Sequence, residues 1–241
     1  MDGDSMKVTL TRVTEKPVSA IEEAASNCYD SEPTADGRIM KSCYKFGHHS
    51  VLEFADFTFH IEGVSRALLA QLTRHRVASF AVQSQRYCAK NDFEYVTPKS
   101  IQNNKEALEC YFDIMNKINE SYAKLQSFGV QNEDARFVLP NACDTVLNVK
   151  MNTRELIHFM NERLCTRAQW EIRELAQKMK KCVIEHDEEC AMLAPMLVPK
   201  CQIHAPFNFC TEHKSCGAAP KLKDVYTAYL KSIGKGSDTD G

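Results

Sequence analysis

The sequence predicts an α+β fold, a single domain in which a mixed or antiparallel sheet is flanked by long helices. Three segments alternate polar and apolar residues, as strands with one buried face do: 7–13, 57–62 and 145–151. Between and after them, apolar residues recur at helical spacing in several longer stretches. No internal repeat or linker divides the chain. We therefore expect one domain over 1–220 and a partly disordered tail over 221–241.

The first fifty residues are predicted to contain one strand and two helices. The strand over 7–13 is followed by Pro17, a residue that the first turn of a helix tolerates, so we expect a helix over 18–28. A second, short helix over 38–46 is expected to end at Gly47, because glycine readily adopts the left-handed conformation that closes helices.

The next strand and helix form the centre of the predicted fold. Phe57, Phe59 and Ile61 fall on one face of the strand, since successive side chains of a strand point to opposite faces. After it, apolar residues one turn apart predict a helix over 64–76. A further short strand is expected over 92–98.

The second half of the chain is predicted to be mostly helical. A long amphipathic helix over 104–128 and a brief helix over 132–139 precede the last strand. Asn152 and Glu155 then match a capping box, in which the first side chain accepts from a free N–H group of the first helical turn. One more helix follows before the chain becomes irregular and cysteine-rich from Glu188.

Composition narrows the class of protein. The 241 residues are 44% hydrophobic and 26% charged, as in globular proteins, with a net charge of −2 and a pI of about 6.5. This balance argues against a nucleic-acid or membrane-surface binder, because such proteins usually carry a basic excess. The first residues are polar and acidic, and no apolar run is long enough to span a membrane. We therefore expect a cytoplasmic protein whose eleven cysteines are reduced.

A cluster of arginines indicates an anion-binding site. Arg74, Arg76 and Arg86 lie close together in the sequence, with His75 between the first two. Their permanent charges repel one another unless an anion lies among them, and a phosphate or a dinucleotide would provide it. The alternative is a solvated basic face paired with acidic residues. The arginines are interleaved with apolar residues and follow an apolar helix, which argues against that alternative.

Two further groups have a functional and a structural interpretation. Asn152 and Arg154 open a predicted helix, whose N-terminus favours anions, but an ordinary capped helix would have the same residues. His48 and His49 precede Glu53 and together suggest a metal or acid–base group, although paired loop histidines are more often structural. Glu53 directly before an apolar strand is unusual, because a carboxylate there needs a partner.

The cysteine-rich C-terminal segment contains zinc-ligand residue types. Cys201, His204, Cys210, His213 and Cys216 follow one another at short spacings, but they match no standard zinc finger. The sequence favours the alternative, a reduced cysteine-rich tail packed on the domain. We therefore expect no metal.

The glycine-rich dinucleotide loop and the P-loop are absent from the sequence. The arginine cluster instead resembles the RHR-x7-S signature of the flavin-dependent thymidylate synthases, with Arg74-His75-Arg76 followed by Ser84. Other segments resemble the family in its order and approximate spacing over 40–180: Gly47-His48-His49-Ser50-x-x-Glu53, Gln71, Arg86-Tyr87, Ala135-Arg136-x-Val138-Leu139-Pro140, Asn152-x-Arg154, and Arg163 followed by Ala168-Gln169-Trp170-Glu171.

The resemblance implies an enzyme that makes dTMP by reductive methylation of dUMP at C5. Methylenetetrahydrofolate would supply the carbon, and FAD, reduced by NADPH, would supply the hydride. The family fold is expected for residues 1–220. The resemblance also implies a homotetramer with active sites shared between subunits, which would explain why arginines for one site are spread so widely along the chain.

Matching the family's motifs by position gives two sets of candidate residues. The resemblance implies that the FAD site contains Ser50, Arg74, His75, Arg76, Val82, Asn152, Thr153, Arg154 and His158. It implies that dUMP is bound by Gln71, Arg74, Ser84, Gln85, Arg86, Arg136 and Arg163. Arg163 is the expected catalytic residue, since a guanidinium facing the uracil would favour the ionised ring and polarise it for attack at C5. Ser84 is interpreted as a phosphate donor, because no base adjoins it within the motif.

Two departures from the family pattern leave alternatives open. The family often has Asn-Glu where this chain has Ala81-Val82, so an acidic side chain is missing unless Gln83 or Gln85 compensates. Phe54 stands where a second histidine is common. One alternative is therefore a diverged, non-catalytic member that binds flavin or nucleotide. Another is an RNA- or DNA-binding module built on the same arginines, against which the net charge of −2 counts.

Overall fold

The computed structural model describes residues 6–233, which form two compact units. The first unit comprises residues 6–13 and 56–151, and the second comprises 14–55 and 152–233. Each unit is thus assembled from two separate stretches of chain. The prediction of one domain over 1–220 stays a prediction. Within the described part of the chain, no helix is both long enough and apolar enough to cross a membrane.

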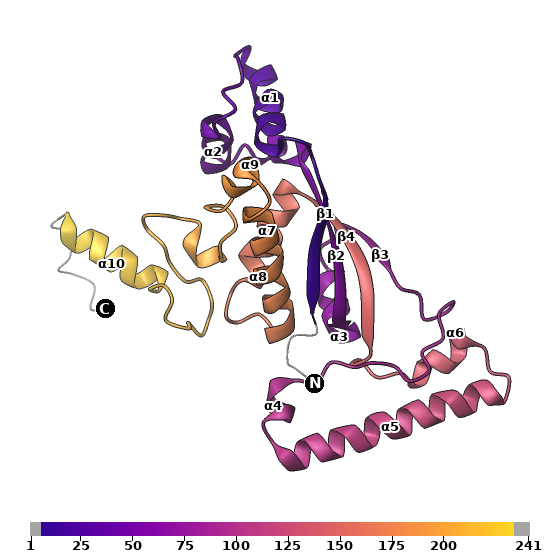
Figure 1. The fold of residues 1–241 in the computed structure, drawn as a ribbon. Coiled ribbons are helices and arrows are strands. Elements are labelled where there is room, and N and C mark those ends of the chain that lie inside the picture. Colours follow the sequence, from indigo (N-terminus) through magenta and orange to yellow (C-terminus); the bar gives the residue numbers. More distant parts are fainter. Residues whose placement is uncertain (1–5, 234–241) are drawn as a thin grey trace. The chain divides into compact units, whose positions relative to one another are not determined.

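The first unit contains a four-stranded sheet in the order β1-β2-β4-β3 (Figure 1). Its strands are β1 (Lys7–Val13), β2 (Asp56–Ser65), β3 (Ser79–Val82) and β4 (Asp144–Asn152). β1 pairs antiparallel with β2, and β3 pairs antiparallel with β4. The predicted α+β class and the three strands expected from alternation are confirmed.

Alternate residues of the two central strands form the buried side of the sheet. Phe57, Phe59 and Ile61 of β2 are each 0% exposed, and Leu147 and Val149 of β4 are buried as well. This is the pattern that a period of two predicts for a strand with one face in the core. Helix α3 (Arg66–Leu72) packs against β2.

Helix α3 is shorter than the helix predicted over 64–76. β2 continues to Ser65, whose hydroxyl accepts from the N–H of Leu68 at 3.0 Å and so caps the helix. The helix ends at Leu72, and the N–H of His75 donates to the Leu72 carbonyl in the turn that follows. The Arg74–Arg76 triplet is therefore on a turn after the helix, not in its last turn.

The strand predicted over 92–98 is wrong. Within that segment only Tyr95 forms an isolated bridge, with Cys143, and β3 supplies the fourth strand of the sheet instead. β3 has only four residues, and its exposure alternates weakly. Its pairing with β4, which is distant in sequence, therefore decides its conformation more than its own pattern does.

The helices α4 (Lys99–Gln102) and α6 (Asn132–Ala135) lie at opposite ends of the long helix α5 (Lys105–Ser127) (Figure 1). The start of α5 is confirmed, because Asn104 Oδ1 accepts from the Ala107 N–H at 3.1 Å. After α6, a short 3₁₀ helix, η2 (Arg136–Val138), precedes β4.

The second unit is helical. Its elements are α1 (Pro17–Tyr29), α2 (Arg38–Lys45), the 3₁₀ helix η1 (His49–Phe54), α7 (Thr153–Arg163), α8 (Trp170–Ile184), α9 (Glu188–Ala191), the 3₁₀ helix η3 (Lys200–Gln202) and α10 (Leu222–Ser232). α7 packs against η1 and α8, and α1 packs against α2 and α9. As predicted, Gly47 follows α2 with a positive φ of 81°.

Two carboxylates anchor helix N-termini in this unit. Glu22, 0% exposed, accepts from the N–H groups of Ile39 and Met40 at the start of α2. Glu189 accepts from the N–H of Val18 at 2.8 Å, at the start of α1. Both contacts satisfy N–H groups that a helix leaves unpaired, and the helix dipole favours a negative charge there.

The C-terminal segment agrees only partly with the prediction. From Met192 to Lys221 it is largely irregular, as expected, apart from η3. Helix α10 was not predicted, and none of its residues is buried. The tail predicted over 221–241 contains this helix, and its last part, 234–241, lies outside the described residues.

Candidate functional site

Two of the predicted dUMP-binding arginines come together in the first unit through Glu133. The Glu133 carboxylate forms an ion pair with Arg86 Nε, and its backbone carbonyl accepts from Arg136 Nε at 2.9 Å. The terminal nitrogens of both guanidinium groups lack hydrogen-bond partners within residues 6–233. Two arginine forks are thus held by their inner nitrogens and remain available at their outer ones.

Glu133 is a site residue that the sequence reasoning missed. It lies in the first turn of α6, three residues before Arg136, where a side chain on a helix has neighbours. Its contact with Arg136 uses the backbone carbonyl, for which no sequence signal exists. Its contact with Arg86 joins segments that are distant in sequence and depends on the tertiary fold.

Ser84 lies in a tight turn that positions Arg86. Its hydroxyl oxygen accepts from the Arg86 N–H at 3.2 Å, and its carbonyl accepts from the Cys88 N–H at 3.0 Å. In the described chain, no hydrogen bond joins this hydroxyl to a histidine, aspartate or glutamate side chain. Without a neighbouring base, Ser84 has no activated oxygen, which favours a role as a hydrogen-bond donor.

Three buried polar atoms near β3 and β4 have no hydrogen-bond partner among the described residues: Arg66 Nε, Gln83 Oε1 and Thr145 Oγ1. The other side of the Arg66 guanidinium donates to the Gln83 carbonyl at 2.7 Å, and burial lowers the pKa of Arg66. Buried polar atoms normally have partners, so each of these three can form a hydrogen bond that the described residues do not supply. The sequence reasoning did not single out Arg66 or Thr145.

Gln83 and Gln85 differ in whether their side chains are already engaged. Gln85 Nε2 contacts Cys143 Sγ at 3.7 Å, and burial raises the pKa of the Cys143 thiol. Gln83 keeps a buried acceptor oxygen without a partner in the described chain. Of the two glutamines considered as a replacement for the missing acid at Val82, Gln83 is therefore the better candidate. Val82 itself pairs with Leu147 in the sheet.

The Arg74-His75-Arg76 segment after α3 contains two exposed cations. Arg74 and Arg76 are exposed, and neither forms an ion pair with any residue from 6 to 233, whereas His75 between them is buried. Gln71, in the last turn of α3, is half-buried. Two unpaired guanidinium groups a residue apart create positive potential that a pyrophosphate or phosphate would neutralise.

The start of α7 organises the candidate residues of the second unit. Asn152 Oδ1 accepts from the Glu155 N–H at 2.9 Å, which confirms the predicted cap. Thr153 is fully buried, and its N–H and hydroxyl both donate to the Ala55 carbonyl, at 2.8 and 3.2 Å. These bonds join α7 to the residue that follows η1, so Thr153 fixes the position of the helix start.

The partner that Glu53 requires is Arg154. Arg154 Nη1 lies 2.6 Å from Glu53 Oε1, so an ion pair joins the predicted anion-binding helix start to the segment in which His48, His49 and Glu53 suggested a metal or acid–base group. Ser50, on the same 3₁₀ helix as Glu53, is exposed. His49 has the structural role: its Nε2 contacts the Tyr44 carbonyl at 3.1 Å, and the two rings stack at 5.3 Å.

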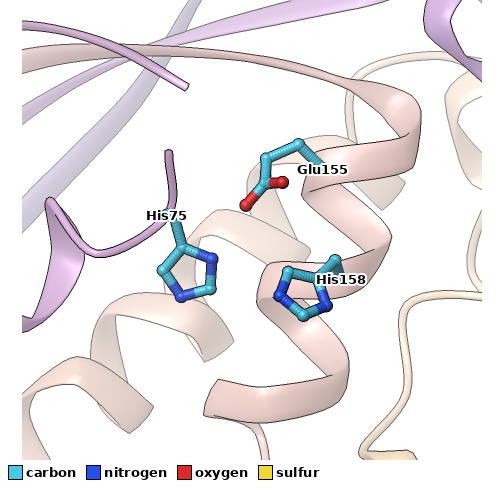
Figure 2. A group of neighbouring side chains, drawn as sticks. All are labelled: His75, Glu155 and His158. Carbon is cyan, nitrogen blue, oxygen red and sulfur yellow. The ribbon is translucent and has the colours of Figure 1, made fainter. Parts of the chain in front are cut away.

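Figure 2 shows that Glu155 and His158 point to the same side of α7. A carboxylate oxygen of Glu155 and a ring nitrogen of His158 lie within 4.8 Å of each other. Glu155 is buried and His158 is exposed, so the exposed imidazole has a carboxylate beside it. The sequence indicated Glu155 only as a capping residue. Arg163, half-buried, ends the helix.

The Asn152 cap gives a direct prediction for stability. Asn152→Ala is expected to lower the free energy of unfolding by about 1 kcal/mol, because it leaves an N–H of the first α7 turn unpaired. Urea unfolding measures the change. Asn103→Ala is the matched control, since Asn103 is exposed and caps no helix N-terminus, and it should change stability by less than about 0.5 kcal/mol. Equal effects of the two substitutions would contradict the prediction.

Comparisons with known proteins cover the segments that carry these residues. The family model described as "Thymidylate synthase complementing protein" matches residues 9–187, a range that includes every predicted site residue. A flavin-dependent thymidylate synthase from Geobacter sulfurreducens is 43% identical over 190 residues, covering 74% of this chain and 82% of the relative. Another from Clostridium tetani is 34% identical over 255 aligned positions, covering 94% of this chain and 100% of the relative.

A solved structure has the same fold. The crystal structure of thymidylate synthase X from Helicobacter pylori with FAD and dUMP superposes with a TM-score of 0.62. The alignment covers 78% of this chain and 96% of that chain, at 22% sequence identity. The fold expected from the motifs is therefore confirmed.

Proposed function

Because the chain belongs to the flavin-dependent thymidylate synthase family, we propose that it converts dUMP to dTMP. Methylenetetrahydrofolate provides the one-carbon unit, and NADPH reduces the bound FAD. The C5 proton of dUMP is replaced by the new carbon, and a hydride completes the methyl group. In this proposal the enzyme acts in the cytoplasm on free nucleotides, without nucleic-acid or membrane partners.

The observation that supports dUMP binding is that Arg86 and Arg136 both contact Glu133, Arg86 through the carboxylate and Arg136 through the backbone carbonyl. A phosphate monoester is a compact dianion that guanidinium groups bind through two parallel N–H···O bonds. The outer nitrogens of both arginines lack partners in residues 6–233, and the Ser84 hydroxyl lies in the turn beside Arg86. We assign these three residues to the phosphate of dUMP, with Gln71, Arg74 and Gln85 completing the nucleotide site.

The proposal that the chain binds FAD is supported by two groups of residues. Arg74 and Arg76 are exposed cations with no ion pair in the described chain, which suits the pyrophosphate of FAD. On α7, Arg154 and His158 are one turn apart and both exposed, so one face of the helix offers a cation and an imidazole. Ser50, His75, Val82, Asn152 and Thr153 complete the proposed flavin set.

The protein's part in the chemistry is orientation and electrostatics. FAD, when bound, supplies the hydride equivalent; this chemistry belongs to the flavin. Arg163 faces the uracil in this proposal and stabilises the negative charge that develops on the ring as C5 becomes nucleophilic. A preorganised guanidinium does this without a proton transfer of its own.

We further propose that the chain forms a homotetramer with active sites shared between subunits. The wide spread of the candidate arginines along the chain, from Arg74 to Arg163, supports this arrangement, because sharing of sites between subunits would explain it. Size-exclusion chromatography with light scattering measures the assembly directly.

The test of the function is an assay of the purified full-length protein. We expect a yellow protein that oxidises NADPH through its flavin in response to dUMP and releases tritium from dUMP labelled at C5 as dTMP forms. Protein that is colourless and takes up no added FAD would overturn the proposal. Bound flavin without tritium release or dTMP would favour a non-catalytic member, the alternative that Ala81 and Val82 suggest.

A further inference from the structure

A cavity in the second unit is lined by α2, η1, the irregular segment over 195–209 and α10. Its volume is about 860 Å³, within the range of cavities that hold a small organic molecule. Every residue that lines it belongs to the second unit. None of the residues assigned above to dUMP or FAD is among them, so the cavity shares no residue with either proposed site.

One wall of the cavity is the apolar face of α10, which consists of Leu222, Val225, Tyr226 and Tyr229. These residues recur at helical spacing, so they lie on one side of the helix. Three of them have exposed fractions above one half: Leu222 at 53%, Tyr226 at 59% and Tyr229 at 52%. Grouped apolar side chains that stay exposed are typical of a binding surface, and this surface faces a space of ligand size.

Aromatic rings from other segments provide flat surfaces in the lining. The rings of His204 and Phe209 stack in parallel, with centroids 4.6 Å apart. Those of Tyr44 and His49 stack at 5.3 Å. All four residues line the cavity, as does the exposed Phe207. Because aromatic rings pack well against other flat rings, by offset stacking or edge to face, this lining favours a ligand with a flat ring system.

The charged groups of the lining are both positive. Lys41 and Lys45 are one turn apart on α2, and both are exposed. The lining contains no aspartate or glutamate, and neither lysine forms an ion pair with any residue from 6 to 233. Two uncompensated ammonium groups beside an apolar cavity attract an anionic group and disfavour a cation.

We propose that this cavity binds a flat aromatic molecule that carries a carboxylate or a phosphate. The ring system packs among the tyrosine, phenylalanine and histidine rings of the lining, and the anionic group lies beside the two ammonium groups of α2. Lysine binds either anion as a point charge, so the chemistry common to both is a negative charge on an aromatic body. The site adds a ligand to those of the proposed function and does not depend on dTMP formation.

Two other occupants fit the lining less well. A neutral apolar molecule would make no use of Lys41 and Lys45. A second copy of the chain would need a broad contact surface, about 800 Å² on each partner, whereas the exposed apolar side chains here surround a hollow of small-molecule size. The experiment distinguishes both of these occupants from an aromatic anion.

Binding of 2-naphthoate to the full-length protein tests the proposal, because this probe is a flat double ring with one carboxylate. Equilibrium dialysis should show about one bound naphthoate per chain, with a dissociation constant below about 1 mM. 2-Naphthamide, which has the same rings without the charge, should bind about 10-fold more weakly. 2-Naphthyl phosphate is the second anion, and the tighter of the two anions identifies the group that the site prefers.

Substitutions test the charged and the aromatic parts of the lining separately. Lys41→Gln combined with Lys45→Gln should weaken naphthoate binding about 10-fold and leave naphthamide binding unchanged. Tyr226→Ser should weaken the binding of both probes by about 5-fold or more, since it removes one ring from the cavity. Lys223→Gln combined with Lys231→Gln is the matched control, because it removes two exposed lysines of α10 that do not line the cavity, and it should change neither affinity.

Three results with the unmodified protein would overturn the proposal. They are the absence of saturable naphthoate binding below about 1 mM, equal affinities for naphthoate and naphthamide, and displacement of naphthoate by dUMP, which would place the probe in the nucleotide site. Light scattering on Tyr226→Ser tests the remaining occupant, because loss of assembly without a change in naphthoate binding would assign the apolar face of α10 to a second copy. All of these measurements are made without turnover, so the cavity and the proposed activity can fail separately.

Discussion

Replacement of Arg163 by alanine is expected to slow dTMP formation by about 100- to 1,000-fold while leaving the flavin content unchanged. In the proposed site, Arg163 stabilises negative charge on the uracil, and this charge is larger in the transition state than in bound dUMP. An interaction that strengthens in the transition state affects kcat more than KM. Single-turnover dTMP formation and tritium release from C5 measure the chemical step.

Two further variants test whether the effect is specific to the guanidinium group of Arg163. Arg163→Lys retains a positive charge at the end of α7 but loses the planar fork, so its rate should fall between the native enzyme and Arg163→Ala. Arg12→Ala, an exposed arginine on β1, should leave the rate unchanged. Native turnover in Arg163→Ala would remove the proposed role. Loss of bound FAD in that variant would point to a structural role for Arg163 instead.

The second large effect is expected at Arg136. Arg136→Ala should raise the KM for dUMP by about 10- to 100-fold, because a hydrogen bond to a charged group contributes about 1.5–3 kcal/mol. The same substitution should leave kcat/KM for deoxyuridine unchanged, since that nucleoside has no phosphate. Steady-state kinetics with both substrates distinguishes a lost phosphate contact from a general disturbance of the site.

Glu133→Gln tests how the phosphate arginines are positioned. The variant loses the ion pair with Arg86 but keeps the backbone carbonyl that accepts from Arg136. Both partners of the ion pair are about half exposed, and such pairs contribute at most about 1 kcal/mol, so the KM for dUMP should rise only a few-fold. A larger effect than that of Arg136→Ala would contradict the assignment of Arg136 to the phosphate.

Local patterns in the sequence were sufficient for most of the elements. The strand over 7–13 and the long helix after Asn104 agree with the structure because their alternation, periodicity and caps depend only on near neighbours in the chain. The strand over 92–98 was wrong, and β3 was missed. Such short strands are decided by the strand they pair with, here β4.

For the candidate site too, local sequence patterns predicted some features and the tertiary structure decided the others. Spaced motifs identified the residue types, and Asn152 caps α7 as its sequence pattern requires. The partners of those residues could not be read from the motifs. Glu53 needed a partner, but only the packing of η1 on α7 identifies Arg154. Likewise, Glu133 joins Arg86 and Arg136 partly through a backbone carbonyl, a group that every residue has.

By itself, the sequence determined the family, the α+β class and the residues available for anion binding. These follow from side-chain chemistry and from periodicity along the chain, and both are local properties. Only the tertiary structure decided that Arg74–Arg76 lie on a turn and that α2 and α10 line one cavity. The physical reason is that contacts between distant segments depend on how whole elements pack, which no short stretch of sequence encodes.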